Sequence, residues 1–224
     1  VEIHGTVAPG FEPVREAFAK NFESGLERGA SATVTLKGET VVDLWAGEAD
    51  PSGRAWERDT IVNVYSTTKT MAALCVLMLA DRDEVDLAAP VATYWPEFAQ
   101  NGKEAVTVSQ VMSHTAGLSG FDPPLEDAAI LYDWEACVER LAAQAPWWKP
   151  GSQSGYHAVT QGYLQGEIVR RVTGRPIGTF FRAEVAEPPG ADFHIGLPAR
   201  EDARVAEPVP PPNALGEGRN TRPA

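Results

Sequence analysis

The hydrophobic pattern changes from helical to alternating within the first fifty residues. Apolar side chains recur at steps of three and four over residues 11–28, which predicts an amphipathic helix closed by Gly29. Residues 32–37 and 40–45 have the pattern of strands, and the two residues between them predict a tight hairpin turn. Residues 47–60 are polar and rich in turn formers, so we expect a surface loop there.

The segment after Tyr65 has a different pattern, because residues 71–80 are apolar on every side of a helix. Such a helix is expected in the interior of a fold, and it has about half of the ~20 residues that a bilayer span needs. The rest of the chain predicts further helices separated by proline and glycine, at residues 107–113, 125–144, 157–173 (ended by Gly174) and 176–186.

Charge and composition limit the classes of partner. Nineteen basic residues against thirty-one acidic ones give a net charge of −12. A chain this acidic repels nucleic acid and anionic membranes, so we expect neither as a partner. The first ten residues lack the features of a secretory signal, which predicts a cytoplasmic protein; secretion after removal of a signal is the alternative.

The cysteines and histidines give no metal-ligand pattern. Cys75 and Cys137 lie far apart in apolar contexts, so we expect two buried free thiols. The four histidines include no pair at the spacing of helical ligands. We therefore expect no metal and no organic cofactor.

One short motif supplies candidate chemistry at the start of the apolar helix. Ser66 and Lys69 form an S-x-x-K pattern, and residues three apart on a helix share one face, so the lysine amine can reach the serine hydroxyl. Serine is a weak nucleophile unless a base removes its proton, and a lysine between apolar walls can do so. The alternative is an N-capping serine beside a solvated lysine. The other serine-hydrolase signature, G-x-S-x-G, is absent, since its nearest match at residues 151–155 has glutamine at the centre.

Two further residues need weighing. Tyr156 follows a Pro-Gly turn at the predicted start of a helix, and a phenol becomes a useful base when a cation lowers its pKa. The alternative is an ordinary half-buried tyrosine. His114 lies at a predicted helix end, and the sequence places no carboxylate to orient it, so we interpret it as structural.

Three motifs together resemble a known superfamily. They are Y-S-T-T-K at 65–69, V-M-S-H-T-A-G-L at 111–118 and P-G-x-x-x-x-Y at 150–156, in this order and spacing. They look like the serine β-lactamase and penicillin-binding-protein-like superfamily, and most like its class C β-lactamase-like branch. Y-H-A-V-T at 156–160 and A-D-F-H-I-G-L-P at 191–198 are most similar to family VIII carboxylesterases.

This resemblance extends from about Phe11 to Pro198 and implies both fold and roles. The implied fold is α/β of the α+β type, a β-lactamase-like sandwich with an antiparallel sheet flanked by helices plus a mostly helical subdomain. Ser66 would be the acylated nucleophile, with its main-chain N–H as one oxyanion donor. Lys69 would accept its proton, and Tyr156 would protonate the leaving group and activate water. The expected substrate-binding residues are Tyr65, Trp148 and His157.

Two departures from the family pattern shape the functional expectation. The class C pattern has asparagine two residues after the tyrosine, where this chain has Ala158, which favours esters over amides. Members of the family carry a third motif, K-T-G or a variant such as H-G-G or W-G-G, on a strand that supplies the second oxyanion N–H. None of these three motifs occurs in this sequence. We therefore expect a serine carboxylesterase that acts on a small-molecule ester. The alternatives are a β-lactamase or acyltransferase on the same residues, or a non-catalytic penicillin-recognising binding homologue.

The domain organisation follows from the same comparison. We expect residues 1–204 to be the N-terminal and helical part of a single β-lactamase-like catalytic domain, and the Pro/Gly-rich residues 205–224 to be a connecting segment. Two predicted strands cannot cover a fully apolar helix, so we expect further strands from a C-terminal portion of the same protein. Assembly into a homo-oligomer is left open.

Overall fold

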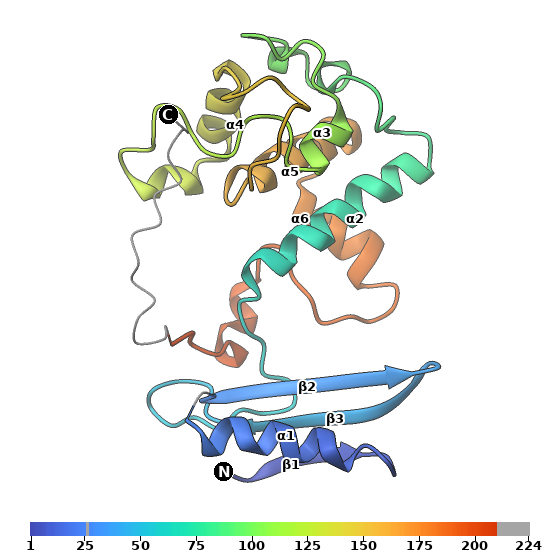
Figure 1. Cartoon of the computed structure of the whole chain (residues 1–224), viewed down its shortest axis with the longest axis vertical. Coiled ribbons are helices and arrows are strands. Elements are labelled where there is room, and N and C mark those ends of the chain that lie inside the picture. The colour runs from blue at the N-terminus through green and yellow to red at the C-terminus, as the bar shows by residue number, and fades with distance from the viewer. Residues whose placement is uncertain (26, 210–224) are drawn as a thin grey trace. The chain divides into compact units, whose positions relative to one another are not determined.

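The computed structural model describes residues 1–25 and 27–209, and these residues form two compact units (Figure 1). The first unit combines residues 1–64 with the segment that begins at Leu197, and the second comprises residues 65–196. The chain leaves the first unit after Val64 and returns to it at Leu197. That residues 1–204 belong to a single catalytic domain stays a prediction. Most of the predicted connecting segment lies outside the described residues.

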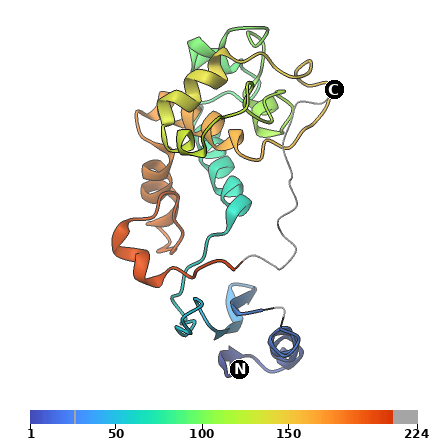
Figure 2. The same cartoon turned by 90° about the vertical axis from the view of Figure 1, so that its left-hand side faces the viewer.

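The first unit is a three-stranded antiparallel sheet with one helix packed against it. Its elements, in sheet order β1-β3-β2 and then the helix, are β1 (Ile3–Val7), β3 (Glu39–Gly47), β2 (Gly29–Leu36) and α1 (Glu12–Glu23). Phe18 of α1 packs with Val42, Leu44 and Ala46 of the central strand, so the helix covers one face of the sheet (Figures 1 and 2). This small core confirms the predicted amphipathic helix and hairpin.

Three details of this unit differ from the expectation. The helix ends at Glu23, and Gly29 begins β2 instead of capping the helix. A Cβ at Gly29 would lie 2.2 Å from the carbonyl oxygen of Glu48, so the glycine permits the close approach of two segments of the main chain. The strand β1 was not expected, because its sequence contains only two large apolar residues, Ile3 and Val7.

The second unit is built almost entirely of helices. A 3-10 turn at Tyr65–Thr67 leads into α2 (Thr68–Asp81), and four further helices follow: α3 (Val108–Met112), α4 (Trp134–Ala143), α5 (Thr160–Thr173) and α6 (Ile177–Phe181). The π-helical turn Arg182–Ala186 continues α6. The other short helical turns of the described chain are 3-10 turns at Val91–Thr93, Pro96–Phe98, Ala128–Tyr132 and, in the first unit, Ala199–Arg204.

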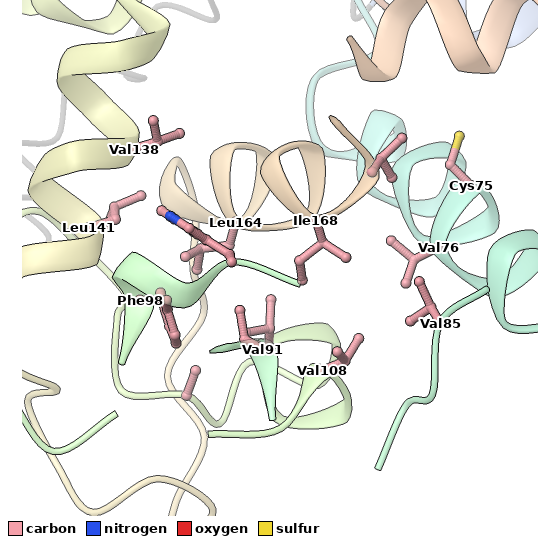
Figure 3. Packing of buried hydrophobic residues seen from close by; sticks show 14 of the residues in the cluster. Cys75, Val76, Val85, Val91, Phe98, Val108, Val138, Leu141, Leu164 and Ile168 are labelled. Carbon is pink, nitrogen blue, oxygen red and sulfur yellow. The ribbon is translucent and has the colours of Figure 1, made fainter. Parts of the chain in front are cut away.

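The core of this unit lies around α5. Leu164 and Ile168 of α5 face Val76 of α2 and Leu141 of α4, with Phe98 close by (Figure 3). All five side chains are buried. The helix α5 is therefore the central support for the elements that carry the candidate site.

The helix boundaries have local causes. Thr107 and Gln110 form a reciprocal capping box that starts α3, and Gly174 ends α5 in a left-handed conformation with a φ of 69°, as predicted. The predicted helix at 125–144 is broken at Asp133, whose carboxylate accepts the N–H of Ala136 and starts α4 there.

The apolar helix α2 is less enclosed than its sequence suggested. Cys75, Val76 and Leu79 are fully buried, but Leu74 and Leu77 are 37% and 47% exposed among the described residues. One face of the helix therefore packs on its unit while another remains accessible in the described structure.

The described residues contain no disulfide, no cluster of metal ligands and no helix long and apolar enough to span a membrane. Cys75 and Cys137 are buried and free of disulfides, as predicted. No group of three or more potential metal-ligating side chains occurs within residues 1–25 and 27–209. Over the same residues, no helix combines the length and apolar character that crossing a bilayer requires.

Candidate active site

Ser66 and Lys69 meet at the start of α2. Tyr65 has a positive φ of 46° and begins the 3-10 turn, which places Ser66 two residues before the first residue of α2. Lys69 lies in the first turn, three residues later, and its Nζ donates a hydrogen bond to Ser66 Oγ at 3.2 Å. The contact is the one that the S-x-x-K spacing predicts on a helical face.

The lysine is held at a second point by a residue far away in the sequence. Lys69 Nζ donates to the main-chain carbonyl oxygen of Ala158 at 2.7 Å. This bond ties the first turn of α2 to the segment just before α5. The side-chain nitrogen of Lys69 is therefore fixed between the serine hydroxyl and a main-chain acceptor.

Tyr156 completes the cluster. A hydrogen bond with Ser66 is the main cause that lowers the pKa of the Tyr156 hydroxyl below its usual value, and the positive charge of Lys69 lowers it further. Lys69 Nζ lies 5.2 Å from the centroid of the phenol ring. The phenol is about half exposed, so the cluster of Ser66, Lys69 and Tyr156 is open to solvent. The structure thus brings together the three residues that the sequence singled out.

His157 lies differently from its expected place in a substrate site. Its side chain is fully buried, and burial lowers its pKa to about 4. Its Nε2 accepts the main-chain N–H of Leu118 at 3.1 Å, and its Nδ1 is 2.6 Å from the carbonyl oxygen of Gly155. Both ring nitrogens are thus engaged by the main chain, which leaves this side chain no free face for a substrate.

Trp148 and Tyr65 are the other two expected substrate contacts. The indole ring of Trp148 packs on Gly155, where an added Cβ would come within 2.3 Å of the ring, and it meets the His157 ring edge to face. Trp148 therefore supports the turn that precedes Tyr156. Tyr65 is 67% exposed next to Ser66, and its contact with substrate stays a prediction.

A comparison with protein families gives the evolutionary context of this cluster. The family model described as Beta-lactamase matches residues 18–222. The chain belongs to the beta-lactamase family. The match spans both units and includes all three residues of the cluster.

Two individual proteins are also similar to this chain. The chain is 42% identical over 212 residues to the protein named Esterase/beta-lactamase LipL of Mycobacterium tuberculosis, an alignment that covers 93% of this chain and 49% of that protein. It is 33% identical over 199 residues to Esterase EstB of Burkholderia gladioli, with 80% of this chain and 50% of the relative covered. The chain thus spans about half the length of these curated relatives.

A solved structure extends the comparison to the fold. A family VIII carboxylesterase is 51% identical, with a TM-score of 0.89 over 93% of this chain and 58% of that one. These matches confirm the predicted β-lactamase-like fold, with its antiparallel sheet and helices, and the resemblance to family VIII carboxylesterases.

Proposed function

We propose that the chain carries the nucleophile and bases of a serine esterase that hydrolyses small carboxylic esters through an acyl-Ser66 intermediate. The observation that carries this proposal is the contact of Lys69 Nζ with Ser66 Oγ beside a tyrosine whose pKa is lowered by the same two residues. The names of the similar proteins, two esterases and a carboxylesterase, support the same reaction class.

The reaction follows from the geometry of the cluster. With Lys69 in its neutral amine form, Ser66 Oγ attacks the ester carbonyl carbon while its proton passes to the lone pair of Lys69 Nζ. The main-chain N–H of Ser66 donates to the developing oxyanion. Tyr156 gives a proton to the departing alkoxide, which leaves as the alcohol. Water then attacks the acyl carbon and gives a proton to Tyr156. The acid is released as Lys69 returns its proton to Ser66 Oγ, which restores the serine hydroxyl and the neutral amine.

The surroundings of Lys69 support an ester over an amide substrate. The main-chain carbonyl of Ala158 holds the side-chain nitrogen of Lys69, so no side-chain amide is needed for that purpose. The methyl group of Ala158 offers neither a donor nor an acceptor to a substrate amide. The acidic sequence, with its net charge of −12, supports a small-molecule substrate and not a nucleic acid. A cytoplasmic place of action and a further C-terminal portion of the protein stay predictions.

β-Lactam hydrolysis is the second candidate, because it would use the same three residues. The name of the Mycobacterium tuberculosis relative includes both activities, esterase and beta-lactamase. Turnover of short-chain p-nitrophenyl esters against a chromogenic cephalosporin separates the two. Binding of either compound without turnover would favour a non-catalytic homologue instead.

Replacement of the nucleophile tests the proposal directly. Ser66→Ala should lower kcat by several orders of magnitude, since loss of a serine nucleophile costs ~10⁶ in a well-studied protease. The free energy of unfolding should change little, because Ser66 is exposed. Ser152→Ala is the matched control, since Ser152 is also exposed in the second unit and lies outside the cluster.

Covalent labelling checks the identity of the nucleophile without any turnover. A serine-reactive phosphonate should add one label to the wild type and none to Ser66→Ala, as read by intact-mass and peptide mass spectrometry. Labelling of Ser113, Ser152 or Ser154 in place of Ser66 would contradict the proposal.

A further inference from the structure

The residues directly before and after Tyr156 in the sequence are both hydrogen-bonded to His114. The main-chain N–H of Gly155 donates to the carbonyl oxygen of His114 at 3.1 Å, and the main-chain N–H of His157 donates to His114 Nδ1 at 3.0 Å. The imidazole also lies against the phenol, with ring centroids 4.8 Å apart. His114 thus contacts the residue before Tyr156, the residue after it and the phenol itself.

His114 occupies this place through an uncommon backbone conformation. Its φ is +62°, in the left-handed region that non-glycine residues seldom adopt, directly after Ser113 at the end of α3. The phenol of Tyr156 is half exposed, so few side chains enclose it. The two bonds from His114 to the flanking main chain are therefore a main source of its position.

The bond to His157 fixes the protonation state of the imidazole. A main-chain N–H can only donate, so His114 Nδ1 must be the unprotonated ring nitrogen. An imidazolium carries protons on both nitrogens and could not accept this bond. Burial and the charge of Lys69 lower the pKa of His114 below its usual value, in agreement with a neutral ring.

We propose that His114 is a positioning residue that holds Tyr156 beside Ser66 and Lys69, and that it does so through an unprotonated Nδ1. The proposal rests on the proposed function for its catalytic consequence, but the contact itself does not depend on turnover. The titratable and charged groups that face His114 are Lys69 from α2 and Tyr156 and His157 from the segment before α5. A proton on His114 would break the bond to His157 and place a second positive charge near Lys69.

Two variants separate the acceptor from the ring. His114→Gly removes the imidazole and adopts a positive φ without strain. His114→Asn also tolerates the left-handed conformation, and its Oδ1 can take the place of Nδ1 as acceptor from the N–H of His157. Asp83→Gly is the matched control: Asp83 is exposed, has a φ of 58° and follows the C-terminal end of α2. Ser66 is at the other end of this fourteen-residue helix, about 21 Å away at ~1.5 Å per residue.

Nuclear magnetic resonance tests the contact without any substrate. In wild-type protein at neutral pH, ¹⁵N shifts of the His114 ring should show Nδ1 without a proton and Nε2 with one. A protonated Nδ1 would overturn the proposal with no variant needed. The ¹³Cζ signal of Tyr156, assigned with Tyr156→Phe, should give a lowered pKa in wild type, His114→Asn and Asp83→Gly. In His114→Gly this pKa should return toward the usual value of ~10.

The rate of Ser66 acylation tests the catalytic consequence. Acylation by a p-nitrophenyl ester should be about 100-fold slower in His114→Gly, the loss typical of a catalytic group displaced by ~1 Å. His114→Asn should restore a rate close to wild type. Equal rates in all variants, or equal losses in His114→Gly and His114→Asn, would overturn the proposal. A wild-type protein with the expected Nδ1 and Tyr156 signals but without acylation would refute the proposed function and leave the positioning of Tyr156 by His114 standing.

Discussion

Ser66, Lys69 and Tyr156 share one set of contacts, so their contributions to rate should not be independent. Lys69 bonds to the nucleophile and also lowers the pKa of the phenol, and the phenol is hydrogen-bonded to the nucleophile. Removal of either base therefore also disturbs the other. Groups that act as one unit show strong non-additivity in mutant kinetics.

A double-mutant cycle measures this coupling. Lys69→Ala and Tyr156→Phe should each remove most esterase activity, and the double variant should be little slower than the slower single variant. The measurement is kcat/KM for one p-nitrophenyl ester across all four proteins, with Lys149→Ala as a control at an exposed lysine of the same unit. Two losses that multiply would show that the lysine and the tyrosine act separately.

Ala158 is the residue at which the choice between ester and amide can be tested. Its main-chain oxygen holds Lys69, so a change of side chain leaves that bond available. Ala158→Asn adds a donor and an acceptor at an exposed position beside the cluster. We expect cephalosporin turnover to rise relative to ester turnover. The measured quantity is the ratio of the two kcat/KM values, with Val159→Asn as a neighbouring exposed control. An unchanged ratio would show that discrimination lies elsewhere.

The sequence predicted which side chains form this cluster, but not the main-chain hydrogen bonds that hold them in place. The contact of Ser66 with Lys69 is local and follows from helical spacing alone. The bond from Lys69 to Ala158 uses a main-chain oxygen, which leaves no signature in the residue type. His114 was expected to be structural because no carboxylate orients it. Its bonds to both neighbours of Tyr156 depend on a left-handed backbone that the sequence does not reveal.

At the scale of elements, a buried lysine fixes the end of α4. Lys103 is fully buried, and its Nζ donates to the carbonyl oxygens of Gln100 and Ala142 at 2.9 Å and to that of Gln144. The last two acceptors lie at the C-terminal end of α4, where carbonyl groups lack helical partners. The side chain of Gln144 in turn bonds the main chain of Gly120. One cation thus links a turn, a helix end and a loop.

Loss of this cation should destabilise the second unit. Lys103→Met keeps a long side chain but leaves three carbonyl groups without their donor, which predicts a loss of about 3 kcal/mol in the free energy of unfolding at ~1 kcal/mol per hydrogen bond. Urea unfolding followed by tryptophan fluorescence measures the change. Lys149→Met is the control, since Lys149 is exposed in the same unit. Equal stability of the two variants would contradict a structural role for Lys103.

Elements with strong local signals were predicted well. The capping glycine at the end of α5 and the hairpin of β2 and β3 were found at or within a few residues of their predicted places. The break at Asp133 was missed, because the apolar spacing on both sides is helical and only the capping carboxylate separates the two elements. The exposed side of α2 also could not be predicted, since a uniformly apolar sequence does not say which face is covered.

At the scale of the whole chain, the two units depend on segments that are far apart in sequence. Residues 204–206 are hydrogen-bonded to the first unit. The N–H of Ile61 donates to the carbonyl oxygen of Arg204, and the N–H of Ala206 donates to the carbonyl oxygen of Ile61. Arg54 also donates to the carbonyl oxygen of Val205 at 2.6 Å. Residues 205–207 are therefore hydrogen-bonded to the first unit, and the connecting segment expected over residues 205–224 stays a prediction. Proline content indicated an absence of helix but could not indicate these main-chain pairings.

The stability of the second unit should fall as the pH is lowered below neutrality. Burial lowers the pKa of His157 from 6.5 to about 4, and the pKa of His114 is lowered in the same direction. The unfolded chain therefore binds protons at a higher pH than the folded chain does. Stability is fully present above the unfolded pKa of ~6.5 and is lost as the pH falls toward 4, by about 3 kcal/mol for His157.

The window between pH 6.5 and 5 isolates this effect, because most carboxylates of an unfolded chain, with pKa values of ~4, remain ionised there. Urea unfolding of the wild type across this window should show a loss of about 1 kcal/mol per pH unit from His157, because the slope reaches its limit of ~1.4 kcal/mol per unit only well below pH 6.5. In His157→Gln the glutamine can still accept the N–H of Leu118, but it does not titrate. The free energy of unfolding of this variant should therefore depend less on pH, by the contribution of one histidine. An identical slope in wild type and variant would mean that His157 takes up its proton equally in the folded and the unfolded chain. The burial of His157 and its hydrogen bonds to Leu118 and Gly155 would then not favour the neutral ring, contrary to what its surroundings predict.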